Sequence, residues 1–378
     1  MSSAKPAGAK RTKRGLMAGE KFTVLGRPTP IPRRIAALGM VVIGILFFLA
    51  VPSLVSSVDV SRIADAGVFI LLALGLNIVV GMAGLLDLGY AAFFAIGSYA
   101  FALLASPQFG IHVPFWVMLF LASAIAAVFG ILLGAPTLRL RGDYLAIVTL
   151  GFGEIVPQTF LNLSQWTGGP NGIGSLDQPV FFGYRFGFDV TPYYYLMLVL
   201  IAFAIWAAGN LRDSRLGRSW MAIREDELAA AHMGINTTTA KLAAFALGAS
   251  FSGLAGVAYG AKLQLVSPDQ FQFNVSIAIL SMLVLGGMGN IPGVIVGSLV
   301  ISSLDRYLLP QATNFLQNVA HVNVDLTNSR FLIYGAILVG MMLFRPEGLL
   351  PSRQRAAEFH ADEGIAAQEQ AMYSKAAS

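Results

Sequence analysis

Residues 75–104 read GLNIVVGMAGLLDLGYAAFFAIGSYAFALL, and this stretch decides the fold class. It carries one charged side chain, Asp87, among apolar residues and glycines. Because a helix of about 20 apolar residues spans the hydrocarbon core of a bilayer, a run of this kind is typical of a membrane protein. The glycines around its first half, which predict a helix that is interrupted or closely packed, are Gly75, Gly81, Gly84 and Gly89.

The whole chain shares this apolar character. Hydrophobic residues make up 56% of its 378 residues, and charged residues make up 12%. Soluble domains carry about 25% charged residues, so a soluble fold of this length would lack the charge to cover its surface. The composition excludes an ordinary soluble enzyme and predicts an all-α polytopic membrane protein.

Apolar segments long enough to cross a bilayer recur along the chain. We predict about ten transmembrane helices, some of them broken or short, over residues 35–55, 64–80, 88–106, 114–135, 143–163, 192–209, 242–262, 274–289, 291–309 and 330–346. They form a transmembrane domain, 35–352. A basic arm, 1–34, precedes this domain and a cytoplasmic tail, 353–378, follows it.

The arm holds nine basic side chains and one acid among Gly, Ala, Ser and Pro. We expect it to be disordered and to lie against the anionic cytoplasmic surface of membrane lipid. A cleavable signal peptide is the competing interpretation. The apolar run 35–55 is longer than the apolar core of a usual signal peptide, which favours a first membrane span.

Basic residues give the orientation. With ten crossings, both termini lie on one side of the membrane, and twenty of the 25 Lys and Arg residues fall on that side. The positive-inside rule makes that side cytoplasmic. This asymmetry accounts for the pI near 9.4 without nucleic acid as a partner.

Two loops are too long to be simple connectors. The outer loop, 164–191, combines turn-forming Gly, Pro and Asn with aromatic residues that suit an interface or a docking surface, and we expect it to be structured. The inner loop, 210–241, holds good helix formers with both charge signs. We predict a short cytoplasmic helix from Ser219 to Met233, ended by Gly234 in the left-handed conformation.

A second glycine-rich stretch, LGGMGNIPGVIVGS at 285–298, resembles the first. Interrupted helices at two places in one membrane protein favour a solute pathway near the middle of the bilayer. The alternative is that each glycine only permits close packing of helices.

Polar groups within the apolar segments are candidates for such a pathway. Glu154 lies near the middle of its span, three residues before Pro157, and it either faces a polar path or holds a kinked helix to a neighbour. Asp87 lies in the interrupted region, where its carboxylate can meet free backbone N–H groups or water. Asn77 and Tyr90 flank that region and either hydrogen-bond a passing solute or join helices.

The adjacent Asp305 and Arg306 are expected to form a solvated local ion pair at an outer helix end.

Signatures of catalysis are missing from the sequence. It contains no phosphate-binding loop, no nucleophile elbow and no cysteine, and its four histidines lack the spacing of metal ligands. We therefore expect neither an enzyme nor a metal site. Active transport would draw on an ion gradient or on a separate ATPase bound to the helix in 219–233. That helix can equally be a solvated amphipathic surface element.

Six blocks then indicate a family. The sequence resembles the membrane permease of branched-chain amino acid ABC importers, the Liv type, M-subunit branch, from about residue 35 to residue 352. The blocks, in chain order, are GLNIVVGMAGLLDLGYAAFFAIGSYAFALL, RGDYLAIVTLGFGEIV, TGGPNGI, AIREDELAAAHMGIN, LVLGGMGNIPGVIVGS and FRPEGLLP.

The resemblance implies a multi-pass protein of a prokaryotic cell membrane that works with a second, related permease, two cytoplasmic ATPases and an extracytoplasmic binding protein. ATP and Mg would be bound by the ATPases, with no cofactor in this chain. The solute would be leucine, isoleucine or valine, moved by alternating access. The closest alternative is a permease for urea or short-chain amides. An ion-coupled secondary transporter and a membrane-embedded enzyme are more distant alternatives.

The resemblance also assigns the inner helix to the ATPase. Permeases of this kind place a short helix in a groove of the ATPase, and its counterpart here is 222–236. The importer motif has Glu-Ala-Ala, three residues and then Gly; Leu228 stands in this chain where that Glu is expected, and Glu227 comes one residue early. The expected coupling residues are Arg224, Glu225, Asp226, Glu227, Ala229, Ala230 and Gly234.

Overall fold

The computed structural model describes residues 50–137, 143–318, 329–345 and 347–350, with the isolated positions 23–24, 27–28, 48 and 326. The chain divides into two compact units, residues 1–56 and 57–378. In the first unit, β1 (Thr23–Val24) pairs antiparallel with β2 (Arg27–Pro28). The rest of the predicted arm, most of the predicted helix 35–55 and the tail lie outside the described residues.

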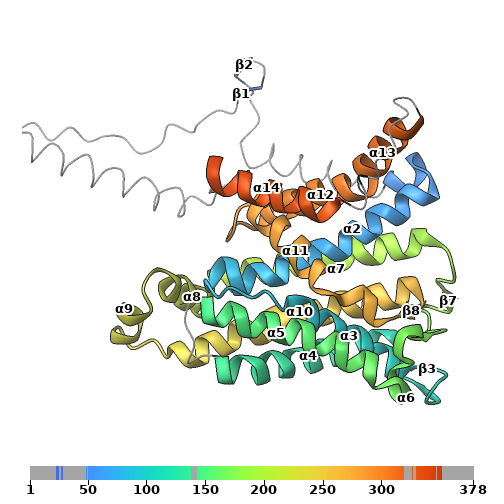
Figure 1. Cartoon of the computed structure of the whole chain (residues 1–378), viewed down its shortest axis with the longest axis horizontal. Helices are drawn as coiled ribbons and strands as arrows, with labels where there is room; N and C mark the ends of the chain where they lie inside the picture. The colour runs from blue at the N-terminus through green and yellow to red at the C-terminus, as the bar shows by residue number, and fades with distance from the viewer. Residues whose placement is uncertain are drawn as a thin grey trace, which may run out of the picture. The chain divides into compact units, whose positions relative to one another are not determined.

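The second unit is a helical bundle (Figure 1). Its α-helices are α2 (Ser57–Leu76), α3 (Tyr90–Leu104), α4 (Phe115–Thr137), α5 (Asp143–Asn162), α6 (Ser164–Thr167), α7 (Val190–Asp213), α8 (Arg215–Glu225), α9 (Glu227–His232), α10 (Thr237–Leu263), α11 (Phe273–Gly286), α12 (Ile291–Ser303), α13 (Leu309–Asn318) and α14 (Arg330–Phe344). Two π-helical stretches, η1 (Asn77–Met82) and η4 (Leu304–Leu308), continue α2 and α12, and η2 (Gly169–Asn171) and η3 (Pro268–Phe271) are short 3₁₀ helices.

Short strands join the outer connections. The pairs are β3 (Ala105–Ser106) with β4 (Ile111–His112), β5 (Ile173–Gly174) with β8 (Leu265–Val266), and β6 (Val180–Phe181) with β7 (Tyr184–Arg185), all antiparallel. The outer loop is therefore structured, as the sequence predicted. Residues Phe182 and Gly183, both at positive φ, form the two-residue turn of the last hairpin.

Membrane-spanning character is clear from helix length and composition. Seven helical segments among the described residues are long and apolar enough to cross a bilayer, and α3 and α14 are shorter apolar helices. These nine helices coincide with nine of the ten segments expected from the sequence. The tenth, 35–55, lies mostly outside the described residues, so the ten-crossing topology and the cytoplasmic termini stay predictions.

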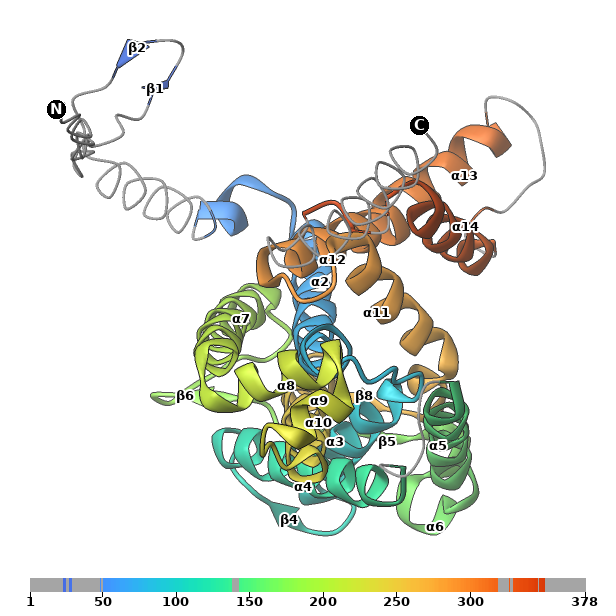
Figure 2. The same cartoon turned by 90° about the vertical axis from the view of Figure 1, so that its left-hand side faces the viewer.

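Helix α10 is the centre of the bundle and packs against α2, α3 and α4 (Figure 2). Glycine makes these contacts close: a Cβ atom on Gly253 would lie 2.8 Å from the Ala122 carbonyl oxygen of α4. Helix α5 differs, because only 28% of its span is buried inside the bundle, against 83% for α2 with η1. One side of α5 is therefore left open at the edge of this chain.

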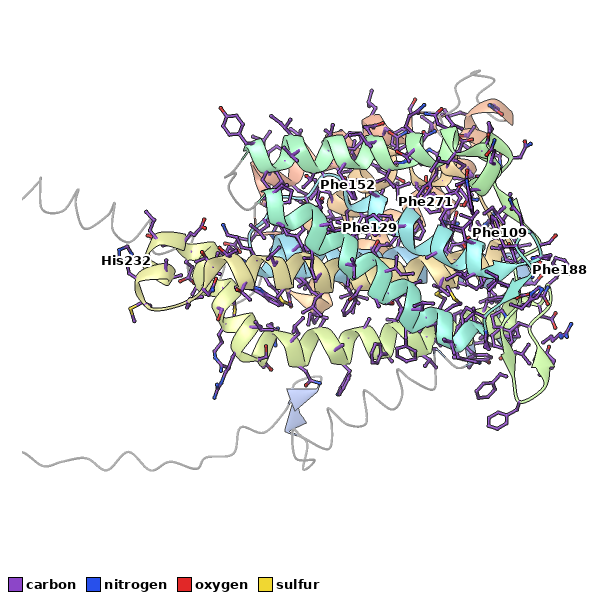
Figure 3. All side chains as sticks on the ribbon, turned by 90° about the horizontal axis from the view of Figure 1, so that it is seen from below. Phe109, Phe129, Phe152, Phe188, His232 and Phe271 are labelled. Atoms are coloured by element: carbon purple, nitrogen blue, oxygen red, sulfur yellow. The ribbon has the colours of Figure 1, made fainter. Side chains whose placement is uncertain are left out.

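The two long loops lie at opposite ends of the bundle. Figure 3 shows His232, at the end of α9, at one end and Phe188, from the outer loop, at the other. This separation agrees with the sequence prediction that one loop is inside and the other outside. Helices α8 and α9, with Met233 and Gly234 after them, form the inner element, which we call the elbow (residues 215–234).

Candidate coupling site and solute pathway

The elbow corrects the single helix predicted for Ser219–Met233. It consists of two helices that meet at Asp226, whose backbone is extended (φ −152°, ψ 110°). The Asp226 carboxylate accepts hydrogen bonds from the backbone N–H groups of Leu228 and Ala229, at 2.8 and 3.0 Å. This N-cap starts α9 and competes with continuation of α8, which explains the break. Gly234 has φ +85° after α9, as predicted.

Buried side chains fix the elbow to the bundle. Trp220 of α8 is fully buried, and its indole N–H donates to the Ala240 carbonyl of α10 at 2.6 Å. Ile223 and Ala230 join the same apolar cluster, together with Ile78 and Met82 of η1. Burial of this apolar surface favours an elbow that moves together with the ends of α2 and α10.

Arg224 connects the elbow to the first glycine-rich interruption. Its Nη1 donates to the Gly81 carbonyl of η1 at 2.7 Å. Its stem lies over Gly84, where an added Cβ atom would be 2.6 Å from Arg224 Cγ. Gly84 has φ +70°, so both its backbone conformation and the space that it leaves suit glycine.

The two glycine-rich interruptions, far apart in sequence, touch each other at this place. Gly289, which has φ +83°, donates its backbone N–H to the Asn77 side-chain oxygen at 2.8 Å. A Cβ atom on Gly81 would lie 2.6 Å from the Gly289 nitrogen, and one on Gly289 would lie 3.5 Å from Arg224 Nη1. Both interruptions and the elbow therefore share one junction, which we call the glycine junction (residues 77–84 and 287–289).

A second tie joins the elbow to α10. Lys241 donates to Glu227 Oε1 at 2.6 Å, and the Lys241 side chain is only 6% exposed. A buried ammonium group requires such a partner, because desolvation of an unpaired charge is costly. Of the expected coupling residues, Arg224, Asp226, Glu227 and Ala230 therefore hold the elbow in place.

The exposed surface of the elbow includes large apolar side chains. Leu228 is 57% exposed and Met233 is 83% exposed, and Glu225, Ala229 and Gly234 lie in the same exposed stretch. Large apolar side chains that project from a membrane protein on its aqueous side are typical of a contact surface. The sequence analysis missed Trp220 and Lys241; an indole and an ammonium beside the expected coupling stretch were the available signals.

Three of the four predicted pathway residues make hydrogen bonds with backbone groups. Besides Asn77, the Tyr90 hydroxyl donates to the Gly248 carbonyl of α10 at 2.7 Å, and Asp87 Oδ1 accepts from the Gly89 N–H at 2.9 Å. All three side chains are buried. Within the described part of the chain, Asp87 Oδ2 and Asn77 Nδ2 have no hydrogen-bond partner. A pathway role for these three stays a prediction.

Glu154 lies in a different environment. It is exposed on the open side of α5 and, with Gln158 one turn later, lines a cavity against η3 and the start of α11. No hydrogen bond or ion pair joins its carboxylate to another residue that the structure describes. The structure does not bring Glu154 together with Asn77, Asp87 and Tyr90.

The ion pairs at the outer end of the bundle differ from the expected one, which was a local pair between Asp305 and Arg306. Arg306 Nη1 instead donates to Asp65 Oδ2 of α2 at 2.6 Å, and Lys262 of α10 donates to the other oxygen of Asp65. The π-helical turn η4 places Arg306 toward α2, and Asp305 is 3.8 Å from Arg330. This ion-pair group ties α2, α10 and the end of α12 together.

The outer hairpin presents aromatic side chains to solvent. Phe182 is 96% exposed at its turn, and Phe188 follows on the same loop. The Tyr184 hydroxyl donates to Asp189 Oδ2 at 3.1 Å, and this hydrogen bond and the carboxylate charge raise the pKa of Tyr184 above its usual value. Exposed aromatic rings of this kind suit a docking surface or a membrane interface.

The part of the chain that the structure describes has no group of three or more His, Asp or Glu residues arranged to hold a metal ion. In the outer connections, His112 Nδ1 lies 2.7 Å from Asp177 Oδ2, which is a pair of such residues and not a group of three.

A bundle of apolar helices, with two interrupted segments that meet beside an exposed elbow, defines the class of polytopic membrane permeases. The sequence comparisons give the family. Residues 60–344 match the family described as "Branched-chain amino acid transport system / permease component", and the chain belongs to this family.

Curated relatives agree with this assignment. The chain is 41% identical over 322 residues to the high-affinity branched-chain amino acid transport system permease protein LivM of Salmonella typhimurium, covering 79% of this chain and 72% of that protein. LivM of Escherichia coli is 40% identical with the same coverage. LivH of Escherichia coli is 24% identical over 300 residues, covering 75% of this chain and 91% of LivH. No solved structure matches the chain at a significant level.

Proposed function

We propose that this chain is the membrane permease subunit of an ATP-driven importer that moves leucine, isoleucine and valine into the cell. Two relatives whose names give the same substrate, LivM and LivH, occur together in Escherichia coli and support a second, related permease as partner. Two ATPases on the cytoplasmic side would bind ATP and Mg, and an extracytoplasmic binding protein would deliver the solute. The chain would cross the cell membrane ten times, with both termini in the cytoplasm.

The elbow is the observation that carries this proposal. Its exposed apolar surface offers an ATPase a contact, while Arg224, Trp220 and Lys241 tie its other side to the bundle. The five basic residues of the inner loop, which support a cytoplasmic location for this end, are Arg212, Arg215, Arg218, Arg224 and Lys241. An ATPase that moves the elbow would therefore move the glycine junction.

Alternating access follows from this connection. ATP binding closes the ATPase pair and displaces the elbow, and the hydrogen bond from Arg224 to Gly81 carries the displacement to η1. Gly289 is tied to Asn77, so the start of α12 shares in the motion. The ATPases and the loaded binding protein drive the change because each binds one state of the permease more tightly.

The test of this proposal is reconstitution of the chain with its partner subunits in proteoliposomes. We expect uptake of radiolabelled leucine to require ATP and the binding protein, and to be competed by isoleucine and valine. Uptake without ATP under an imposed proton or sodium gradient would assign a secondary transporter. Competition by urea in place of leucine would assign the importer of urea or short-chain amides.

Contact of the elbow with the ATPases is tested by changing only its exposed surface. The combined substitution Leu228→Asp and Met233→Asp should abolish co-purification of the ATPases, because it places charges in the apolar contact. The fold of the elbow should be retained, because both side chains are exposed. Phe182→Asp, at the exposed outer turn, is the matched control and should leave co-purification unchanged. Unchanged binding of the ATPases to the double variant would contradict the proposed contact.

A further inference from the structure

The cavity beside Glu154 is an unassigned feature of the bundle. Glu154 lies ten residues from one end of the span Tyr144–Asn162 and eight from the other, about 12 Å inside the nearer end. Gln158 follows four residues later, so both polar side chains share one face of α5. A charged group exposed at this depth is unfavourable against lipid hydrocarbon, and such groups face other protein or a water-filled path.

The opposite wall of the cavity comes from the turn before α11. Pro268 begins η3, and a capping box between Ser267 and Gln270 fixes the conformation of this turn. Asp269 and Gln272 are exposed there, and Gln272 Nε2 donates to Asp269 Oδ1 at 3.4 Å. A second carboxylate, held by an amide group, therefore faces the same space as Glu154.

The cavity has a volume of about 260 Å³. A water molecule occupies about 30 Å³ in the liquid, so this space has room for on the order of nine waters and is large enough to admit a small free amino acid. Its polar lining residues are Glu154, Gln158, Asp269, Gln272 and Asn274, and its apolar lining residues are Pro157, Leu161, Pro268 and Phe273.

This lining matches the three parts of a branched-chain amino acid. The two carboxylates attract a primary ammonium group, which has three N–H donors and no acceptor. The amides of Gln158, Gln272 and Asn274 supply N–H donors for an α-carboxylate. Leu161 and Phe273 offer apolar surface for an aliphatic side chain.

We propose that this cavity is a subsite for the α-ammonium group of the transported amino acid, with Glu154 and Asp269 as its anionic partners. The inference rests on the proposed import function and deepens it by naming the recognised group. Urea and neutral amides lack an ammonium group, so this subsite would favour amino acids over them. The open side of α5 leaves the subsite incomplete in this chain, and the second permease of the pair closes it.

The chain contains no cysteine, so single cysteines can report on this site in the natural background. Gln158→Cys retains both carboxylates, and in the reconstituted complex we expect a cationic methanethiosulfonate reagent to modify it at least tenfold faster than an anionic one. Leucine delivered by the binding protein should slow the modification. Ile155→Cys, exposed on α5 outside the cavity, is the matched control and should show neither effect.

The outcomes separate the subsite from the importer function. No modification of Gln158→Cys, or equal rates with the two reagents, would overturn the subsite even where the wild-type complex imports leucine with ATP. Protection by leucine with a preference for the cationic reagent supports it.

A second measurement uses uptake in the same complex. Glu154→Gln should lower the maximal uptake rate at least tenfold with ATPase binding retained, and Glu154→Asp should restore part of it. Unchanged uptake by Glu154→Gln would also overturn the subsite. Absence of ATP-dependent uptake by the wild type is a failure of the proposed function instead.

Discussion

Two regions of this membrane protein place polar groups within apolar segments, and they do so in opposite ways. At the glycine junction and the neighbouring start of α3, Asn77, Asp87 and Tyr90 are buried, and each makes a hydrogen bond with backbone. On α5, Glu154 and Gln158 are exposed beside a cavity. We infer that Asn77 and Tyr90, which are buried with backbone partners far away in sequence, join segments of the bundle, and that Glu154, exposed beside a cavity, is the candidate for facing a path.

The largest expected effect concerns close packing at the start of α3. A Cβ atom on Gly89 would overlap the Thr149 carbonyl oxygen of α5, so Gly89→Val forces α3 and α5 apart. Overpacking costs about 1–3 kcal/mol and more where backbone atoms collide. We expect loss of the monodisperse protein in detergent size-exclusion chromatography. Gly151→Ala on α5, where an added Cβ has nothing within 4 Å, should be neutral, and equal loss in both variants would break the comparison.

The next effect concerns the connection between the elbow and the glycine junction. Arg224→Met removes the hydrogen bond to Gly81 while preserving most of the side-chain volume. A hydrogen bond from a charged donor contributes about 1.5–3 kcal/mol. We therefore expect about tenfold less leucine taken up per ATP hydrolysed in proteoliposomes, with the ATPases still bound.

Arg218→Met is the control for that experiment, because Arg218 is exposed on the same helix and its guanidinium donates to the nearby Asp213 carbonyl. This variant should take up the wild-type amount of leucine per ATP hydrolysed. A wild-type ratio of uptake to hydrolysis in Arg224→Met would show that the junction receives the motion by another route.

A smaller effect is expected at Tyr90. Tyr90→Phe removes the hydroxyl that donates to Gly248 and keeps the ring, so it should lower stability by about 1 kcal/mol, the usual net value of one such bond. Thermal unfolding of the detergent-solubilised complex measures this change. Tyr144→Phe, exposed on α5, should leave the melting temperature unchanged, and an equal shift in both variants would contradict the structural role of Tyr90.

Much of the fold could be predicted because bilayer thickness and hydropathy constrain helix position strongly. Nine of the ten predicted segments are helices in the described chain, and the two glycine-rich stretches hold the connections from η1 to α3 and from α11 to α12. The break at Asp226 was missed because good helix formers on both sides outweighed the capping tendency of one aspartate. An Asp followed by Glu-Leu-Ala-Ala was the available signal.

The sequence predicted which residues belong to the candidate site, from their types, but not which of them contact each other. Arg306 pairs with Asp65 across 241 positions, and Gly289 pairs with Asn77 across 212, and no local pattern specifies such contacts. For the same reason Glu154 and Asn77 looked alike in sequence. The direction in which each side chain points from its helix distinguishes them. A helix that is apolar on all sides gives little information in its sequence about that direction.

The most direct test measures melting temperature and leucine uptake per folded complex for two variants side by side. Asn77→Ala should lower the melting temperature, because it removes the acceptor of the Gly289 N–H, a loss of about 1–3 kcal/mol for a buried group. Glu154→Gln should leave the melting temperature unchanged and reduce uptake at least tenfold. A loss of stability in Glu154→Gln with normal uptake, or the same pattern in both variants, would contradict the division between residues that join helices and residues that face the path.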